Sequence, residues 1–417
     1  MARQRQGAAW LLDINLTAGS VGLVLLVLIA VTIVAAPAAQ AQTLTVLHNF
    51  TGGADGGFPF AGITFDQQGR IYGTTTTGGS HQDGVVYRLV REGEGWVLSP
   101  IYSFQGEPDG AGPYSRVVFG PDGLLYGTTY AGGAEGFGTV FSLRPPATAC
   151  KSALCPWVET VLYSFTGGAD GAYPGYGDLS FDQAGNIYGT TYAGGNSGNG
   201  VVFKLSPSSG GWSESVLWKF TDGSDGAGPL GGVIFDSAGN LYGATSAGSS
   251  SRLGTVYELS PTQSGWSETT LYSFTGDTGA GSGGLIMDAH GNLFGITGGL
   301  DGGISIAYEL TPQNGSWSFT VLQNFGEEYV GAFAAPTFDS HGILYGSLPT
   351  VGSDFTGEIF QLTPSGDRWI YRSFYTFNGS NAGVPLGAVT FDASGNMYGT
   401  GIAGGSDYDG SVWEITP

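Results

Sequence analysis

One phrase recurs seven times along this chain of 417 residues. It consists of an apolar run, a turn of the Asp-x-x-Gly type and an aromatic-Gly step. The aromatic residue of that step falls at Tyr72, Tyr126, Tyr188, Tyr242, Phe294, Tyr345 and Tyr398, so that successive copies are 54, 62, 54, 52, 51 and 53 residues apart. A period of about 50 residues is typical of the blades of a β-propeller rather than of a helical repeat.

Each copy divides into four strand-like runs, called a to d in chain order. In the fourth copy we expect strands at residues 232–236, 240–245, 254–260 and 266–274, with Pro261 ending the third. Apolar and polar residues alternate in runs c and d, and Asp and Gly occupy the turn between a and b. No segment of the predicted mature chain shows sustained helical periodicity.

Run d carries a Trp that precedes a Phe by eight residues. Because eight is even, we expect both rings on one face of the strand, packed between neighbouring blades. A stripe of aromatic side chains that stacks on sugars is the alternative interpretation. The pairs are Trp96/Phe104, Trp157/Phe165, Trp212/Phe220, Trp266/Phe274, Trp317/Phe325 and Trp369/Phe377.

The two ends of the repeat array complement one another. Residues 43–50 form a d-type run that precedes any a run, and the chain closes with a, b and c of the seventh copy. A d strand from the N-terminus can complete the last blade and close a ring, which removes exposed sheet edges. An open β-solenoid would not need these two orphan parts. We therefore predict an all-β, seven-bladed propeller with four antiparallel strands per blade.

Composition agrees with short strands and tight turns. Glycine accounts for 76 residues and aromatic residues for 13%, while charged residues are only 11%. There is no Gly-X-Y period, which excludes collagen, and the patterned hydrophobic fraction of 41% excludes a disordered chain. The formal net charge of −21 argues against nucleic acid and anionic membrane surfaces as partners.

The N-terminus has the features of an export signal. Arg3 and Arg5 precede an uncharged apolar run at residues 21–34, and residues 39–41 fit a small-x-small cleavage site. We expect residues 1–41 to be a signal peptide and residues 42–417 to be the propeller, secreted or associated with the cell envelope, with no membrane insertion after cleavage. An uncleaved anchor is the alternative, although the run falls short of the ~20 apolar residues of a spanning helix.

The two cysteines, Cys150 and Cys155, lie in the insertion that lengthens one repeat. In an oxidising compartment we expect them to form a local disulfide. Two cysteines alone cannot complete a four-ligand zinc site.

The repeats resemble the GloVer (Gloeo-Verruco) tandem-repeat family of exported bacterial proteins. The matching segments include GLLYGTTYAGGAEGFG at residues 123–138, NIYGTTYAGGNSGNG at 186–200, and FTGGADG at 50–56 and 165–171. The resemblance covers residues 43–417. It implies an exported or surface protein with a propeller-like fold and implies no enzyme activity.

The loops from d to a carry acidic residues at one equivalent position, and in propellers these loops share a face with the b-to-c loops. A ring of carboxylates around the mouth could attract Ca²⁺, which takes oxygen ligands. Ordinary Asp-Gly turn chemistry is the favoured explanation, so we assign no metal ligand. The position is occupied by Asp55, Asp109, Asp170, Asp225, Asp277, Glu328 and, as an amide, Asn381.

The b-to-c loops bring tyrosine beside carboxylates. Tyr130, Tyr192 and Tyr408 are the candidates for stacking on a sugar, and loop residues that pack on themselves are the alternative. Asp301, Asp354, Asp407 and Asp409 accompany them. The aspartates of the a-to-b turns are expected to stabilise those turns on the opposite face.

Enzyme signatures are weak. None of the four histidines forms a metal-spaced pair, and there is no Gly-x-Ser-x-Gly elbow, P-loop or dinucleotide fingerprint, so we assign no catalytic residue. We expect a monomeric binding or structural module for a polysaccharide or a surface protein. The alternative is a carbohydrate-active hydrolase or lyase that works from the central mouth, because carboxylate pairs can cleave glycosidic bonds.

Overall fold

The computed structural model describes residues 42–146, 157–281, 283–298, 304–326, 334–350 and 356–417. Thr43–Thr416 form one compact unit. The expected signal peptide and the two cysteines lie outside the described residues, so both stay predictions. Within the described ranges, no helix has the length and apolar character needed to cross a membrane.

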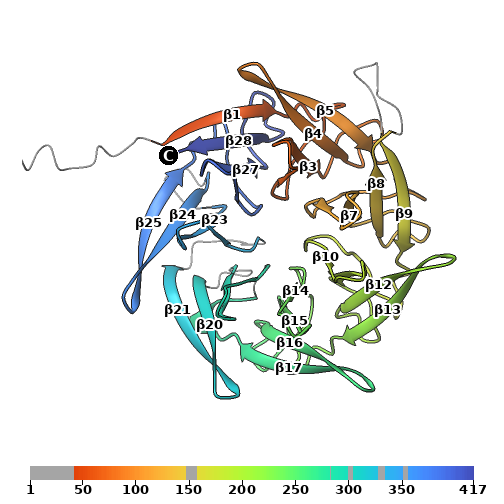
Figure 1. Cartoon of the computed structure of the whole chain (residues 1–417), viewed down its shortest axis with the longest axis vertical. Helices are drawn as coiled ribbons and strands as arrows, with labels where there is room; N and C mark the ends of the chain where they lie inside the picture. Colours follow the sequence, from red (N-terminus) through yellow and green to blue (C-terminus); the bar gives the residue numbers. More distant parts are fainter. Residues whose placement is uncertain (1–41, 147–156, 282, 299–303, 327–333, 351–355) are drawn as a thin grey trace, which may run out of the picture. The chain divides into compact units, whose positions relative to one another are not determined.

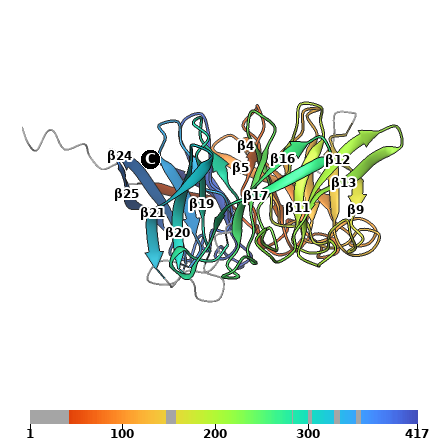
Figure 2. The ribbon, with the colours of Figure 1, turned by 90° about the horizontal axis from the view of Figure 1, so that it is seen from below.

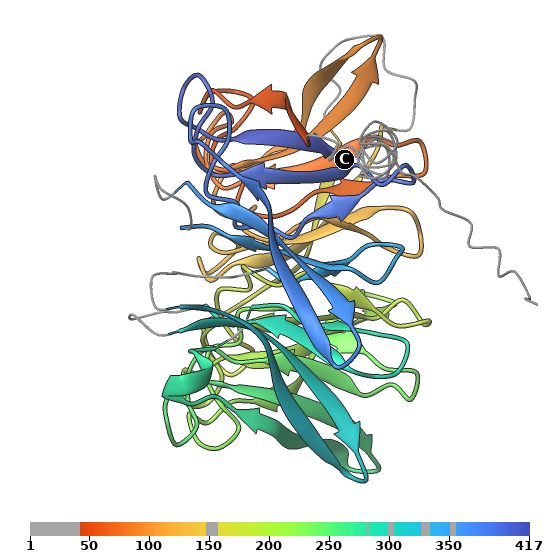
Figure 3. The same ribbon diagram turned by 90° about the vertical axis from the view of Figure 1, so that its left-hand side faces the viewer.

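Seven four-stranded antiparallel sheets form a closed ring, which confirms the predicted propeller (Figure 1). In every blade strand a is innermost and strand d outermost. Two views at right angles to the first show the blades around the edge of the ring (Figures 2 and 3). One short 3-10 helix, η1 (Gly276–Thr278), interrupts the described loops.

The blades are numbered 1 to 7 from the first complete copy, and each lists its strands from a to d. Blades 1 to 4 comprise β2 (Thr64–Phe65), β3 (Ile71–Thr75), β4 (Val85–Glu92) and β5 (Gly95–Ser103); β6 (Val118–Phe119), β7 (Leu125–Thr129), β8 (Thr139–Arg144) and β9 (Val158–Ser164); β10 (Ser180–Phe181), β11 (Ile187–Thr191), β12 (Val201–Ser208) and β13 (Gly211–Lys219); and β14 (Ile234–Phe235), β15 (Leu241–Ala244), β16 (Thr255–Thr262) and β17 (Gly265–Ser273). Blades 5 to 7 comprise β18 (Ile286–Met287), β19 (Leu293–Ile296), β20 (Ser305–Gln313) and β21 (Ser316–Gly326); β22 (Thr337–Phe338), β23 (Leu344–Leu348), β24 (Glu358–Ser365) and β25 (Arg368–Thr376); and β26 (Thr390–Phe391), β27 (Met397–Gly401), β28 (Ser411–Thr416) and β1 (Thr43–Asn49).

Two expected strand limits were wrong. The a strands are only two residues long, and the turn begins directly after the second residue, with Asp in six blades and with Gly120 in blade 2. Pro261 does not end strand c: β16 continues to Thr262, and Pro261 pairs with Trp266. Strand β15 begins at Leu241, opposite Leu259, and does not reach as far as Pro261. The missing N–H of Pro261 therefore faces no partner strand.

Every outer strand contains a β-bulge, and the bulge overturns one prediction. In blade 4, Tyr257 pairs with Thr270 and Val256 with Tyr272, so Leu271 is an extra residue without a partner. One extra residue changes the parity of the strand, and residues eight apart then lie on opposite faces. The Trp and the Phe of strand d therefore do not share a face. The extra residue at this place is large and apolar in all seven blades, and blade 5 has a second one, Phe325. The seven are Leu47, Ile101, Leu162, Leu217, Leu271, Leu322 and Phe374.

The bulge lets one strand serve two interfaces between blades. Trp266 packs with Phe220 and Tyr257 between blades 3 and 4, whereas Phe274 packs with Tyr308 and the bulged Leu271 between blades 4 and 5. The same division holds around the ring, which contains one hydrophobic cluster for each of its seven interfaces. The expected packing between blades is thus confirmed, and burial of each large side chain stabilises the ring by roughly 1.5–3 kcal/mol.

The N-terminal strand closes the ring as predicted. β1 pairs with β28, and Leu47 and Phe50 are buried against the first complete blade. On the inner side, the Thr390 hydroxyl of blade 7 donates to the Ile63 carbonyl of blade 1 over 3.1 Å, and Thr64 links blade 1 to the Val117 carbonyl of blade 2 in the same way. Closure therefore rests on a strand ladder, on packing and on hydrogen bonds between a strands.

Removal of the closing strand should destabilise the whole ring. A chain that begins at residue 51 lacks β1, exposes the edge of β28 and loses the burial of Leu47, which alone contributes about 1.5–3 kcal/mol. We expect a clearly lower melting temperature than for a chain that begins at residue 42, measured by differential scanning calorimetry. Equal melting temperatures for the two truncations would show that β1 is dispensable.

Candidate functional site

The loops from d to a and from b to c of one blade lie on the same face, as expected. Short antiparallel bridges join them in five blades: Gly57/Thr77, Ala111/Ala131, Ala172/Ala193, Ala227/Ala247 and Gly383/Ala403. We call this side of the ring the loop face. The opposite side, which carries the a-to-b turns, is the turn face.

Four of the predicted d-to-a carboxylates hold their own loops in shape. Each accepts a hydrogen bond from the backbone N–H four residues earlier and contacts a polar ring atom of strand d seven residues earlier. The backbone donors are Thr51, Gln105, Thr166 and Thr221, at 3.1, 3.1, 2.8 and 3.1 Å from Asp55, Asp109, Asp170 and Asp225. The ring atoms belong to His48, Tyr102, Tyr163 and Trp218, at 3.0, 2.9, 3.1 and 3.2 Å. Turn chemistry explains these four aspartates.

Asp277 does not occupy the equivalent place. It lies exposed in η1, and the Thr278 hydroxyl accepts the backbone hydrogen bond, from Thr275 over 2.8 Å. Glu328 lies outside the described residues. Within the described ranges no group of three or more potential ligands converges, so the structure supplies no cation site from these carboxylates.

The aspartates of the a-to-b turns also have the predicted structural role. Asp236 Oδ1 accepts from the backbone N–H groups of Ala238 and Asn240, and its Oδ2 accepts from the hydroxyl of Tyr242 over 3.2 Å. Burial would raise the pKa of Asp236, but hydrogen bonds from Asn240, Ala238 and Tyr242 hold it below its usual 3.8. Asp66, Asp182 and Asp392 make the same arrangement.

Acidic residues of adjacent blades face each other across three interfaces, and in the third, burial and then the charge of Asp225 contribute to a raised pKa of Glu268. Burial and then the charge of Asp109 raise the pKa of Glu159 to about 7, and burial with the charge of Asp170 does the same for Glu214 despite Lys219. The Oε1 atoms of both glutamates are buried without a hydrogen-bond partner. These glutamates follow the strand d Trp by two residues and so face the preceding blade.

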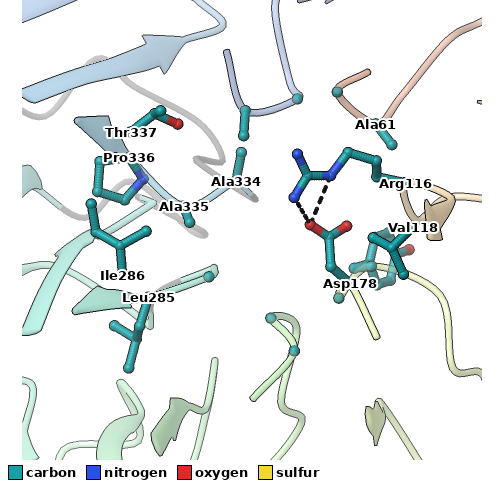
Figure 4. Close-up of a pocket in the computed structure, with 18 of the residues that line it drawn as sticks. Ala61, Arg116, Val118, Asp178, Leu285, Ile286, Ala334, Ala335, Pro336 and Thr337 are labelled. Carbon is teal, nitrogen blue, oxygen red and sulfur yellow. Dashed lines mark hydrogen bonds and ion pairs between the residues drawn. The ribbon is translucent and has the colours of Figure 1, made fainter. Parts of the chain in front are cut away.

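A cavity of about 680 Å³ opens in the centre of the ring. Among the described residues that line it, Arg116 and Asp178 alone are charged. Arg116 Nε lies 3.0 Å and Nη2 2.5 Å from Asp178 Oδ2, and Nη1 lies 3.5 Å from the Ile63 carbonyl. Figure 4 shows the pair projecting into the cavity opposite the apolar side chains of Leu285, Ile286 and Pro336.

The charged pair breaks the symmetry of the repeats. Arg116 and Asp178 lie at the same repeat position, directly before the buried apolar residue that precedes strand a. The other five blades have only small residues at this position: Gly62, Gly232, Gly284, Ala335 and Ala388. Sequence reasoning missed this pair because it compared carboxylates in loops. An alignment of the seven a strands would have found it.

Six aromatic residues, which we call the aromatic rim, gather beside the cavity on the loop-face side of blades 1 to 3. Tyr130 and Tyr173 stack with ring centroids 4.8 Å apart, and Tyr114 contacts Tyr130 at 5.5 Å and Tyr176 at 5.4 Å. Phe60 contacts both Tyr114 and Tyr176. Phe60, Tyr114 and Tyr176 also line the cavity.

Tyr192 completes the aromatic rim. Burial raises the pKa of Tyr176 to about 12, and the nearby phenols of Tyr130, Tyr114 and Tyr192 contribute to the increase. Tyr192 itself is 42% exposed and, within the described residues, makes no ring contact with the other five, although its phenol also acts on the pKa of Tyr130. Two predicted tyrosines are thus brought together, whereas Tyr408 lies in blade 7, is 74% exposed, and has no ring contact within the described part of the chain.

The aromatic rim is also a departure from the repeat. Blades 4 and 7 carry Leu230 and Leu386 where blades 1 to 3 have Phe60, Tyr114 and Tyr176. Blades 1, 4 and 7 carry Thr76, Ser246 and Ile402 where blades 2 and 3 have Tyr130 and Tyr192. Within the described residues, these aromatic side chains therefore gather beside blades 1 to 3. Blade 6 has Phe333 at the repeat position of Phe60, and Phe333 lies outside the described residues.

Local backbone geometry makes room for the rings. Tyr173 has a φ of 60°, a left-handed conformation that disfavours bulky residues, and the equivalent residues of blades 2 and 4 are Gly112 and Gly228. A Cβ atom on Gly175 would lie 2.8 Å from Cδ2 of Tyr130, and one on Gly228 would lie 3.0 Å from Cε2 of Tyr192. Blades 1 and 7 have Phe58 and Val384 at the same left-handed position, with φ of 55° and 53°. This backbone conformation costs about 1 kcal/mol or more at Tyr173.

Loop aspartates that accept hydrogen bonds from their own loop should contribute more to the free energy of unfolding than loop aspartates that are exposed. Asp225→Ala should lower the free energy of unfolding by about 1–3 kcal/mol, because the backbone N–H of Thr221 and the indole N–H of Trp218 lose the buried carboxylate that accepts from them. Asp277→Ala should change it by no more than about 0.5 kcal/mol, because that side chain is exposed. Urea unfolding of both variants tests this, and equal losses would refute the distinction.

Stability should increase as the pH falls below neutrality. The pKa of Glu159 and Glu214 is about 7 in the folded state and 4.5 for an unperturbed glutamate, so the folded protein binds more protons between these values. The free energy of unfolding should therefore rise from about pH 8 to about pH 5. Below 3.8 the trend should reverse, because the lowered pKa of Asp182 and Asp236 means that their contribution is lost as pH falls through the folded-state value.

The double variant Glu159→Gln/Glu214→Gln should flatten the rise between about pH 8 and pH 5, since amides do not titrate. Urea titrations at several pH values provide the measurement. An unchanged slope in the double variant would assign the effect to other groups.

Comparisons with known proteins agree with the fold. The Gloeobacter/Verrucomicrobia repeat matches residues 32–154 and 157–304. An ulvan lyase from a new family of polysaccharide lyases is 12% identical, with 86% of this chain and 94% of that chain covered and a TM-score of 0.51. PorZ, a surface component of the type-IX secretion system of Porphyromonas gingivalis, is 14% identical, with 86% of this chain and 46% of that chain covered and a TM-score of 0.50.

At such identities the two structures share the fold alone. No curated protein matches the chain. The repeat match covers well over half of the sequence and continues through both complete motif strings that carried the resemblance, at residues 123–138 and 186–200. The chain therefore belongs to the Gloeobacter/Verrucomicrobia repeat family.

Proposed function

We propose that this protein is an exported, monomeric binding module that holds a polysaccharide at the loop face. Its binding surface would be the aromatic rim together with the Arg116–Asp178 pair. The observation that carries the proposal is the concentration of six aromatic side chains on one side of a central cavity in a fold built from near-equal blades. Export rests on the predicted signal peptide at residues 1–41.

Aromatic faces suit sugars because the C–H side of a pyranose is apolar while its edge carries hydroxyl groups. Tyrosine offers both a ring and a polar tip. In the described part of the chain, the hydroxyls of Tyr114, Tyr130 and Tyr173 make no hydrogen bond to another side chain. They remain available to donate to, and accept from, hydroxyls of a ligand.

The charged pair would supply the polar contacts of the same surface. Asp178 uses Oδ2 for both bonds from Arg116, which leaves Oδ1 as an acceptor, and its side chain is 39% exposed. The cavity of about 680 Å³ falls within the ~300–1,000 Å³ typical of small-molecule sites. It would accommodate the end of a glycan chain, while the rim supports the units that follow.

A carbohydrate-active hydrolase or lyase is the second candidate. The observation in its favour is that Arg116 and Asp178 break the repeat symmetry in the centre of the ring, where sister blades have Gly or Ala. The likeness to the ulvan lyase adds only a shared fold. Reducing-sugar release from a bound polysaccharide, lost in Asp178→Asn, would favour this candidate over simple binding.

Binding to a glycan and polysaccharide array tests the proposal. The wild type should give specific hits, and Tyr130→Ala and Tyr192→Ala should each weaken binding by about tenfold. Loss of stacking on one aromatic ring costs roughly 1–3 kcal/mol. Gly175→Ala should have the same direction of effect, because the added Cβ would displace the ring of Tyr130.

Tyr408→Ala is the matched control. It removes a more exposed tyrosine from a b-to-c loop on the same face without touching the aromatic rim, so binding should not change. Affinity that falls equally in the Tyr408 variant, or an array without hits, would contradict the assignment and favour a protein partner.

A further inference from the structure

A second cavity, of about 820 Å³, lies on the turn face between blades 1 and 2. Its walls include the a-to-b turns of both blades, strand c of blade 1 and the ring of Trp157. None of the residues proposed above for the polysaccharide surface lines it. We call this cavity the turn-face cleft.

Three departures from the repeat meet in the turn-face cleft. Arg70 stands where the other blades have Leu124, Asn186, Asn240, Asn292, Ile343 and Asn396. Arg88 stands where they have Ser142, Lys204, Glu258, Glu309, Gln361 and Glu414. Gly120 stands where they have Asp66, Asp182, Asp236, Asp288, Asp339 and Asp392. Two positive charges have been gained, and one carboxylate has been lost from the lining.

The result is a local excess of positive charge. Among the described residues, the charged ones that line the cleft are Asp66, Arg70 and Arg88, in a chain whose net charge is −21. Asp122 also lies in the blade 2 turn, but its Oδ2 accepts from the Tyr126 hydroxyl over 2.7 Å and it does not line the cleft. A cationic concavity on so acidic a surface favours an anionic ligand.

The two arginines differ in what they already bind. Arg70 Nε donates to Asp66 Oδ2 over 2.5 Å, and its Nη2 donates to Gln68 Oε1 over 2.9 Å. Arg88 has no hydrogen bond or ion pair among the described residues, and its Nε is buried. It is the only basic side chain in the described ranges with a buried nitrogen left in this state.

A buried donor without a partner costs stability, and more so when it is charged. Both arginines act on one phenol: burial and the charge of Asp66 raise the pKa of Tyr72 to about 12, and the charges of Arg70 and Arg88 oppose that rise. Arg88 pairs with Tyr72 across the blade, and no group of the described protein accepts a hydrogen bond from its buried Nε. An oxyanion would supply the missing acceptor with suitable geometry.

We propose that the turn-face cleft is a second ligand site, which binds a small molecule through a carboxylate or sulfate group held by Arg88. Arg70, fixed by Asp66, adds a second positive charge. Gln67, Gln68 and the exposed edges of Phe65 and Phe119 are available for the remainder of the ligand. The volume admits an acidic sugar as readily as an inorganic anion.

Isothermal titration calorimetry of the purified protein at low salt tests this site, with sodium glucuronate and inorganic sulfate as probes and glucose as the neutral comparison. At least one oxyanion should bind, and Arg88→Gln should weaken it by about tenfold or more. Arg88→Lys should retain part of the affinity. Tyr130→Ala, on the loop face, should leave it unchanged, so the outcome is independent of the polysaccharide proposal.

Lys204→Gln is the matched control, because Lys204 occupies the same repeat position in blade 3 and lies over the ring of Tyr188. Its removal should not alter oxyanion binding. Should Arg88→Gln fail to fold by circular dichroism, Arg70→Gln provides the second test. Absence of heat with both oxyanions, or an affinity that Arg88→Gln leaves intact or Lys204→Gln reduces equally, would overturn the proposal.

Discussion

The architecture depends on one extra residue in each outer strand. The bulged residue, Leu271 in blade 4, turns the strand so that its beginning packs on the preceding blade and its end on the following one. A flat strand with the same Trp and Phe would bury both rings on one side and leave the other interface without aromatic packing. Seven such strands make each blade a partner of both neighbours, which is what a closed ring requires.

The sequence was sufficient for the number of blades, the phase of the repeat and the closure by residues 43–50, because these follow from spacing. Face assignment failed because counting from Trp266 to Phe274 assumes an unbroken alternation, and nothing in the spacing marks the bulge. The prediction that Pro261 ends strand c failed for a related reason. A proline is tolerated in a strand where no neighbouring strand needs its N–H, and β15 does not extend to Pro261. The extent of a neighbouring strand is a tertiary property that the local sequence does not show.

The candidate sites were only partly accessible to the same reasoning. Tyr130 and Tyr192 were identified by residue type, and the structure brings them into one group. Tyr408 is also a tyrosine of a b-to-c loop, but it lies apart in blade 7. The loop carboxylates attracted attention because they recur, yet recurrence is what a structural role produces. Asp225 and Asp236 recur because most blades form the same turn around the equivalent carboxylate.

Departures from a repeat are more informative than its constants, because each sister blade shows what the fold requires at a position. The other five blades form with Gly or Ala at the position of Arg116 and Asp178. Most blades form with an uncharged or acidic residue at the position of Arg88. Stability therefore does not account for these charges, and the buried Nε of Arg88, which has no acceptor among the described residues, opposes it. The Arg116–Asp178 pair lies in the central cavity and Arg88 in the turn-face cleft. The two cavities share no described lining residue, so a ligand in one need not compete with a ligand in the other.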